Sequence, residues 1–425
     1  RFAFASEIKA LLQGRVVDPE IDPKGFADYL VLSEPAGGRT FFAGIECLPA
    51  GHWIRVRAGA DALEVDRHRY YRPTFEPVED LSFDEACEEL LRLLGNAVRS
   101  HLVADVEVGL TISGGIDSTL LALLMAECHT ETIRAFTIGS QSEHPDLRVA
   151  RQICSGIDCQ HDVYVPSFEE YMALIPDLVA ATERPTRAFG HPFFLLCHRI
   201  AKRVKVCLCG EGADELFGGY PEFVEPHRRF RGILRGLERL RKLGLQPTEE
   251  ALELSDLRDP RNRSSSQWLP KLFEYHLGHA LPRRHLESAD HYSMSASLEM
   301  RVPFLDHDLV EFVNRLPIPY KVNLPFGIRK HVLKRAALDR YGSVVADAAL
   351  REKMGFPQSV GTHLQRFEQL CDQWLPADYL ESHDMGFRFR RKRDLLLYDL
   401  FLEIFFERRG VVGDDFDLTD FMRSR

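Results

Sequence analysis

Short apolar segments alternate with helical ones between residues 106 and 209, and this alternation constrains the fold more than any other feature of the chain. We expect strands at 106–112, 133–138, 163–165 and 204–209, with helices between them. Strands that alternate with helices in this way indicate a parallel, doubly wound α/β sheet. Ligands of such sheets bind beyond the carboxyl ends of the strands. The chemistry is therefore expected in the segments that directly follow the strands.

Charge and composition exclude several classes of function. The chain has 425 residues, and its 54 Lys and Arg against 64 Asp and Glu argue against a broad nucleic-acid-binding surface. No apolar run reaches the roughly 18 residues of a membrane span. Nine cysteines without a CxxC pair argue against a disulfide framework or a zinc cage. We expect a protein of the reducing cytoplasm, with neither nucleic acid nor membrane as a partner.

The ends of the chain differ in pattern from this middle part. Turn signals and short apolar runs in residues 1–72 predict the edge of a β-rich domain, and 73–80 is predicted to be a linker. Ser82 and Glu85 then form a capping box, which predicts the start of a helix.

From residue 221 onward the pattern is helical. The basic stretches 228–242 and 388–393 are predicted to be solvated faces, and the acidic stretch 414–417 a flexible tail.

The first chemical motif is the segment SGGIDST at residues 113–119, directly after the first predicted strand. Two glycines let the backbone approach an anion, and the helix that follows supplies free N–H groups. An aspartate beside bound phosphate would be repulsive unless a cation intervened, so we infer Mg²⁺. An ordinary Gly-Gly turn capped by Asp117 or Ser118 remains the alternative. The predicted phosphate cradle consists of Ser113, Gly114, Gly115, Asp117, Ser118 and Thr119.

The second motif, GEGADELFGGY at residues 210–220, follows the last predicted strand. It combines four glycines with the carboxylates of Glu211, Asp214 and Glu215. An acidic surface turn is the alternative, although such a turn needs only one or two glycines.

These two motifs resemble a known family. SGGIDST resembles the pyrophosphate-binding loop of ATP pyrophosphatases that adenylate a substrate, and the second motif resembles the signature of asparagine synthetases. The resemblance implies that Asp117 and Asp214 hold Mg²⁺ against the phosphates of ATP, and that Glu211 orients or deprotonates an attacking amine. It also implies nucleotide contacts at Gly210 and at Ile138-Gly139, which ends the second predicted strand.

Two later segments add to the resemblance. Residues 295–306 are similar to the family's E-x-R-V-P-F-L-D stretch, which implies that Glu299 lies near the reacting acyl group. A local ion pair between Glu299 and Arg301 is the alternative. Residues 328–334 are similar to a segment in which one lysine, here Lys330, reaches the α-phosphate. A solvated helical lysine is the alternative there.

The N-terminal segment resembles part of another domain. Residues 4–12 are similar to the closing part of the N-terminal-nucleophile glutaminase domain that precedes such synthetases. The catalytic N-terminal cysteine of that domain has no counterpart, because Cys47, the first cysteine, is internal. We therefore expect 1–76 to be a β-rich glutaminase remnant that does not hydrolyse glutamine by itself. Residues 77–425 are then the synthetase domain, with a nucleotide-binding sheet in 77–220 and mainly helices in 221–425.

The function implied by the resemblance is an ATP-dependent, AMP-forming amide ligase. Asparagine synthesis is the first expectation: ammonia attacks a β-aspartyl-adenylate made from aspartate. A related cyclase, which closes a β-lactam or macrolactam ring with an amine of the same molecule, is the first alternative. An inactive nucleotide-binding scaffold is the second. A homodimer or a separate glutaminase is the expected protein partner.

Overall fold

The computed structural model describes residues 2–59, 62–75, 80–139, 144–185, 191–261, 263–351, 361–386 and 389–425. The predicted domain boundary at residues 76 and 77 lies outside this part of the chain, as does Arg388. None of the described helices combines the length and the apolar character needed to cross a bilayer.

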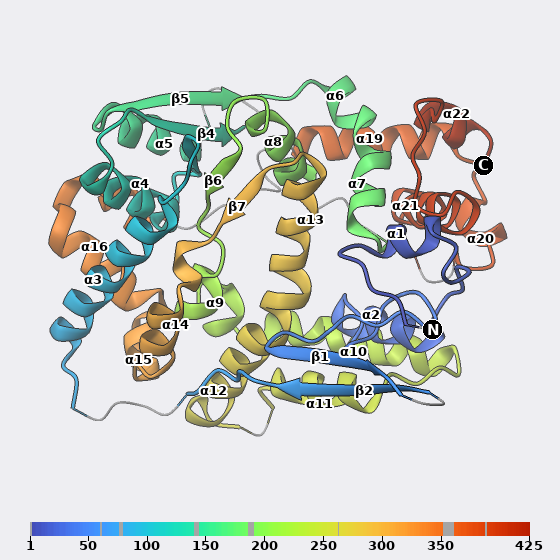
Figure 1. Ribbon diagram of the computed structural model, residues 1–425, viewed down its shortest axis with the longest axis horizontal. Coiled ribbons are helices and arrows are strands. Elements are labelled where there is room, and N and C mark those ends of the chain that lie inside the picture. Colours follow the sequence, from blue (N-terminus) through green and yellow to red (C-terminus); the bar gives the residue numbers. More distant parts are fainter. Residues whose placement is uncertain are drawn as a thin grey trace.

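The predicted parallel α/β sheet is confirmed. Five strands lie in the order β5-β4-β3-β6-β7, and all neighbours are parallel (Figure 1). Of these five strands, β3 comes first in the chain but lies in the centre of the sheet. The chain therefore adds strands on both sides of β3, as in a doubly wound sheet. The bounds are β3 (Val108–Thr111), β4 (Ile133–Ile138), β5 (Cys159–Tyr164), β6 (Val206–Leu208) and β7 (Glu299–Arg301).

The edge strand β7 was not predicted, because its three residues are too few to show an alternating pattern. It comes from the segment expected to be helical, so residues after 221 complete the sheet that the sequence placed in 77–220.

Both faces of the sheet are covered, as the alternation of β4 illustrates. Ile133 and Ala135 belong to one hydrophobic core, whereas Phe136 and Ile138 belong to the other. The first core contains residues of α3 (Phe83–His101), α4 (Ile116–Cys128), α5 (Pro145–Ser155), α14 (His307–Asn314) and α16 (His331–Tyr341). The second contains residues of α7 (Ile175–Thr182), α8 (His191–Ile200) and α21 (Lys392–Leu402), together with Tyr292 of α13 (Glu287–Ser295).

The capping box at the start of α3 is confirmed. The Ser82 hydroxyl accepts from the Glu85 backbone N–H, and the Glu85 carboxylate accepts from the Ser82 backbone N–H at 2.9 Å. Leu90, Leu94 and Val98 follow on the buried face of the helix.

The N-terminal segment is only partly β-structured. Its described part holds the helices α1 (Ile8–Gln13) and α2 (Pro23–Leu32), followed by a hairpin of β1 (His52–Ala58) and β2 (Leu63–Arg69). Phe41 and Phe42 pack edge-on against Phe401 and Phe405, so this segment shares a core with the C-terminal helices. Figure 1 shows the two chain ends on the same side of the molecule.

The remaining elements are mostly helical, as predicted. They are α6 (Phe168–Ala173), α9 (Ala213–Phe217), α10 (His227–Lys242), α11 (Glu249–Leu257), α12 (Ser265–Tyr275), the π-helix η2 (His276–Leu286), α15 (Ile318–Lys321), α17 (Ala346–Leu350), α19 (Gly361–Trp374), α20 (Tyr379–Ser382) and α22 (Leu418–Arg423), with a small pair of β8 (Val322–Asn323) and β9 (Ile328–Arg329).

The prediction for the acidic stretch 414–417 is wrong, and the prediction for the basic stretch 388–393 fails at Arg393 although Arg390 and Arg391 are exposed. The acidic residues 414–417 do not begin a flexible tail, because they lead into α22, whose Met422 is fully buried. In the basic stretch 388–393, Arg393 is buried and pairs with Glu368 at 3.2 Å. Sequence periodicity could not reveal the burial of Met422 or of Arg393, because the burial of each depends on the packing of α19, α21 and α22.

The close packing of α10 against α2 gives a stability prediction. A Cβ atom at Gly236 would lie 2.5 Å from the Leu30 carbonyl oxygen, whereas Gly232 has open space around it. Gly236→Ala should lower the free energy of unfolding by about 1–3 kcal/mol through overpacking, despite the better helix propensity of alanine. The matched variant Gly232→Ala should raise it by up to about 1 kcal/mol. Urea denaturation measures both, and equal effects would contradict the packing.

Candidate active site

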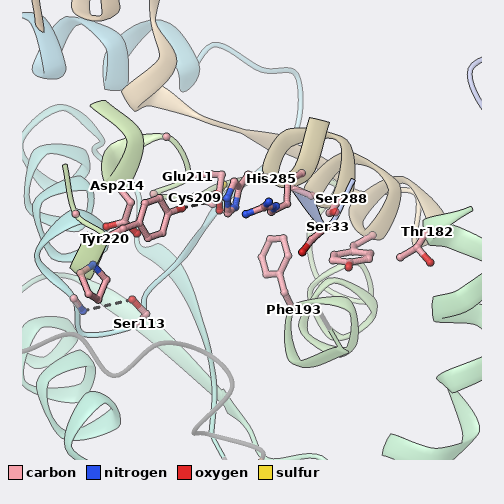
Figure 2. A pocket seen from close by; sticks show the side chains of 18 of the residues that line it. Ser33, Ser113, Thr182, Phe193, Cys209, Glu211, Asp214, Tyr220, His285 and Ser288 are labelled. Carbon is pink, nitrogen blue, oxygen red and sulfur yellow. Dashed lines mark hydrogen bonds and ion pairs between the residues drawn. The ribbon is translucent and has the colours of Figure 1, made fainter. Parts of the chain in front are cut away.

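A cavity of about 1220 Å³ opens where three strands of the sheet end. Ser113 follows β3, Ile138 ends β4 and Gly210 follows β6, and all three line the cavity. Figure 2 shows Ser113 and Asp214 at one end of this cavity and Phe193 and Thr182 toward the other. The cavity therefore lies at the edge of the sheet where the sequence places the ligand.

Most of the predicted site residues come together in this cavity. Those that line it are Ser113, Gly115, Asp117, Ser118, Ile138, Gly139, Gly210, Glu211 and Asp214. Four predicted site residues do not line the cavity: Gly114, Thr119, Lys330 and Glu299. Their positions are described below. What the lining residues bind stays a prediction.

The loop after β3 is held by its own hydroxyl groups. The Ser118 hydroxyl accepts from the Ser113 backbone N–H at 3.0 Å and donates to the Gly115 carbonyl at 3.2 Å. Gly114 has a φ of 71°, and a Cβ there would overlap the Asp146 carbonyl oxygen, so the position requires glycine. Thr119 is fully buried, so its predicted hydroxyl contact to phosphate is not supported by its position.

Asp117, Asp214 and Lys330 form a compact charged cluster. The Lys330 ammonium lies 2.7 Å from both carboxylate oxygens of Asp117 and 2.6 Å from Asp214 Oδ1. Lys330 is only 4% exposed and pairs with two aspartates that line the cavity, although it does not line the cavity itself. Its alternative interpretation as a solvated helical lysine is therefore wrong.

The backbone around this cluster leaves no room for other residues. Lys330 precedes α16 with a φ of 54°, and its N–H donates to the Phe217 carbonyl at 3.1 Å. A Cβ at Gly219 would overlap both the Asp214 carboxylate and the Lys330 side chain. Gly219 of the second motif therefore serves the packing of this cluster.

The cluster fits a divalent cation. Because both carboxylates reach one ammonium nitrogen, the same two side chains can also bind a single small cation with oxygen ligands. Asp117 and Asp214 also line the cavity, so phosphate oxygens could complete the coordination.

A second cluster lies beside the first and joins Glu211, Glu215, Tyr220 and His285. His285 Nδ1 is 3.4 Å from Glu211 Oε1, and its Nε2 is 3.3 Å from the Tyr220 hydroxyl. The Tyr220 hydroxyl donates to Glu215. Figure 2 shows Glu211, Tyr220 and His285 side by side.

Burial perturbs the titration of this second cluster. It raises the pKa of Glu215 to about 8, with help from the negative charges of Glu211 and Asp214. It lowers the pKa of His285 to about 3, so the imidazole is neutral at physiological pH. Glu211, Glu215 and His285 are close enough to share a metal ion, but the Tyr220 hydroxyl already occupies Glu215, and we interpret the group as a hydrogen-bonded cluster.

The predicted position of Glu299 beside the reacting acyl group is wrong. Glu299 pairs with Val206 at the start of β6, which is about 13 Å along the strand from Gly210. Its side chain is 57% exposed, and it accepts from Arg301 at 2.7 Å. The alternative of a local ion pair is therefore the correct one. Parallel pairing placed this residue at the amino end of the sheet, and the motif alone gave no sign of it.

His285 is the site residue that the sequence did not indicate. It lies in η2, 65 positions after Tyr220, and no motif or spacing connects the two. Only the packing of η2 against α9 brings the imidazole to Glu211.

Comparisons with known proteins agree with these motifs. A family model described as asparagine synthase matches residues 89–408, and one described as a glutamine amidotransferase domain matches residues 1–71. A putative glutamine-hydrolyzing asparagine synthetase of Mycobacterium bovis is 30% identical over 88% of this chain and 64% of its own length. Asparagine synthetase 1 of Bacillus subtilis is 26% identical over 96% of this chain and 72% of its own length. The chain thus spans slightly less than two thirds of the first of these relatives.

Similarity to solved structures is weaker. An NH3-dependent NAD synthetase of Campylobacter jejuni overlaps 47% of this chain and 96% of its own at 18% identity, with a TM-score of 0.26. An overlap this low carries no weight beside the strand order of the sheet.

Replacement of Lys330 should make the two aspartates responsive to Mg²⁺. Lys330→Met leaves two carboxylates without their ammonium partner, and breaking a buried pair costs about 3–5 kcal/mol. Added MgCl₂ should restore much of this loss and raise the melting temperature of the variant more than that of the unmodified protein. Thermal unfolding with EDTA or MgCl₂ measures the difference. A Lys330→Met variant that MgCl₂ does not stabilise would show that the aspartates do not share a cation.

Lys321 gives a stability prediction that depends on pH. It is buried over the Phe273 ring at 4.2 Å, and burial lowers its pKa to about 7. In the unfolded chain the lysine pKa is about 10.4, so between pH ~7 and ~10 the unfolded chain binds more protons than the folded protein. The free energy of unfolding should therefore rise by up to about 1.4 kcal/mol per pH unit over this range. Lys321→Met should remove this slope, whereas Met at the exposed Lys242 should not. Urea titrations across this range would contradict the assignment if both variants kept the slope.

Proposed function

This chain belongs to the asparagine synthase family, and we propose that it is an ATP-dependent, AMP-forming amide ligase. The observation that carries the proposal is the cluster of Asp117, Asp214 and Lys330 at the carboxyl ends of β3 and β6. A reaction at phosphate needs positive charge and a loop that binds phosphate. Here two carboxylates can hold a cation, Lys330 supplies an ammonium, and a glycine-rich loop lies beside them.

The first step is adenylation of a carboxylate. A carboxylate oxygen of the substrate attacks the α-phosphorus of ATP, pyrophosphate leaves and an acyl-adenylate forms. Asp117 and Asp214 would hold Mg²⁺, which neutralises phosphate charge. Lys330 lies within reach of the same position and stabilises the negative charge that develops on the phosphates. The loop of Ser113, Gly115 and Ser118 positions the pyrophosphate.

The second step is amide formation. The amine attacks the acyl carbon, a C–N bond forms, and the C–O bond to AMP breaks. Glu211 lines the same cavity and accepts the proton that the nitrogen loses. Aspartate and ammonia are the proposed substrates, through a β-aspartyl-adenylate. The ammonia is free or comes from a separate glutaminase partner.

The size of the cavity favours a second candidate. A volume of about 1220 Å³ exceeds the ~300–1,000 Å³ that is common for small-molecule sites. A larger carboxylate that carries its own amine, as in a lactam-forming cyclase, would use this space. The glutamate at position 211 favours the intermolecular reaction, because its carboxylate can accept the proton of an external amine.

The test is pyrophosphate release from Mg-ATP with and without L-aspartate, while ammonium is added or withheld and asparagine is assayed. We expect aspartate-dependent pyrophosphate release and asparagine formation from ammonium. Release that ignores aspartate would favour the cyclase, and panels of larger amino carboxylates would follow. No ATP consumption with any carboxylate would favour the inactive scaffold.

A matched pair of variants connects this activity to the cluster. Asp117→Asn should lower aspartate-dependent pyrophosphate release by at least about a hundredfold, since it removes the charge that holds the cation. Asp339→Asn removes a carboxylate from an exposed pair with Arg335 and should leave the rate unchanged. An unchanged rate in Asp117→Asn would overturn the proposed role of the cluster.

A further inference from the structure

The contact between His285 and Glu211 extends the proposed mechanism. We infer that His285 is a positioning residue, which holds the Glu211 carboxylate toward the attacking amine. The inference rests on the proposed function, in which Glu211 accepts the proton of that amine.

The two ring nitrogens of His285 face different neighbours. Nδ1 lies 3.4 Å from Glu211 Oε1, while Nε2 lies 3.3 Å from the Tyr220 hydroxyl and 3.6 Å from Glu215 Oε1. Glu211 and His285 both line the cavity, whereas Glu215 is fully buried behind them. The imidazole therefore lies between the reactive carboxylate and the protein interior.

The chemistry of the partners assigns the ring hydrogen. A carboxylate accepts hydrogen bonds but does not donate them, so contact with Glu211 requires the hydrogen on Nδ1. Nε2 then carries no hydrogen, and it lies 3.3 Å from the Tyr220 hydroxyl oxygen, whose own hydrogen goes to Glu215. A distance of 3.4 Å is long for such a bond, as is common at catalytic contacts before the substrate binds.

The position of His285 is fixed by its neighbour in the chain. Arg284 donates to both carboxylate oxygens of Glu34, at 2.7 and 2.8 Å, and to the Leu32 carbonyl at 2.6 Å. Burial would raise the pKa of Glu34, but Arg284 and His279 lower it to about 2, so this pair is charged throughout the physiological range. The end of η2, and with it the imidazole, is thereby tied to the residues that follow α2.

The charges around the imidazole come from several elements. Glu211, Asp214 and Glu215 face it from the loop after β6 and from α9, Glu34 from the N-terminal segment, and Arg284 and His276 from η2 itself. Burial outweighs the attraction of these carboxylates and favours a neutral ring, whose Nδ1 hydrogen can be donated to Glu211. In the amide-forming step the proton passes from the amine nitrogen to Glu211, and His285 keeps its own hydrogen.

Two substitutions of similar size separate positioning from space filling. The amide of Asn can take the place of Nδ1, whereas the amide of Gln takes the place of Nε2. His285→Asn should therefore keep the contact with Glu211, and His285→Gln should lose it. Both variants should retain aspartate-dependent exchange of pyrophosphate into ATP, because adenylation does not use Glu211. Asparagine formation from ammonium should fall by about tenfold or more in His285→Gln only.

The outcomes separate this inference from the proposed function. Aspartate-dependent exchange in the unmodified protein tests the proposed function first, and its absence would count against that function alone. Equal rates of amide formation in the two variants would overturn the positioning role. Crystal structures of the three proteins test it without any activity: Glu211 should keep its orientation in His285→Asn and lose it in His285→Gln. An unchanged Glu211 in His285→Gln would also overturn the inference.

Discussion

The ion cluster of Asp117, Lys330 and Asp214 is the interaction on which the site depends. Lys330 is 213 positions from Asp117 in the chain, yet its ammonium lies within 2.7 Å of that carboxylate. The cluster joins the loop after β3, the turn after β6 and the start of α16, so it connects three segments at the end of the cavity where Ser113 and Asp214 lie (Figure 2). A buried ammonium needs both carboxylates, and the two carboxylates need a cation. The same charges that stabilise the fold are therefore those that the reaction would use.

The wall beside this cluster, where His285 lies, depends on a second buried pair. Glu34 and Arg284 connect the N-terminal segment to η2, and His285 follows Arg284 directly. The N-terminal segment contributes to the site in this way although none of its own residues carries a proposed catalytic role. The cavity is also lined by α2 residues such as Tyr29 and Val31, so its shape depends on that segment as well.

Sequence patterns predicted those features that are local or repeat along the chain. The apolar alternation located β3, β4 and β6, and the two glycine-rich motifs located Asp117, Glu211 and Asp214, because each motif directly follows a strand. Features that depend on distant contacts were missed or wrong. Glu299 could not be placed without the pairing of β7 with β6, and His285 could not be found without the packing of η2 against α9.

The aromatic contacts of Phe41 and Phe42 with Phe401 and Phe405 have a consequence for the modularity of the chain. The segments matched by two different family models share one hydrophobic core, because rings from both belong to it. Residues 77–425 produced without the N-terminal segment would expose an aromatic surface to water, which favours aggregation. An amidotransferase segment from another protein could replace this one only if it had aromatic side chains that pack against Phe401 and Phe405. The N-terminal segment is thus part of the same hydrophobic core as the C-terminal helices.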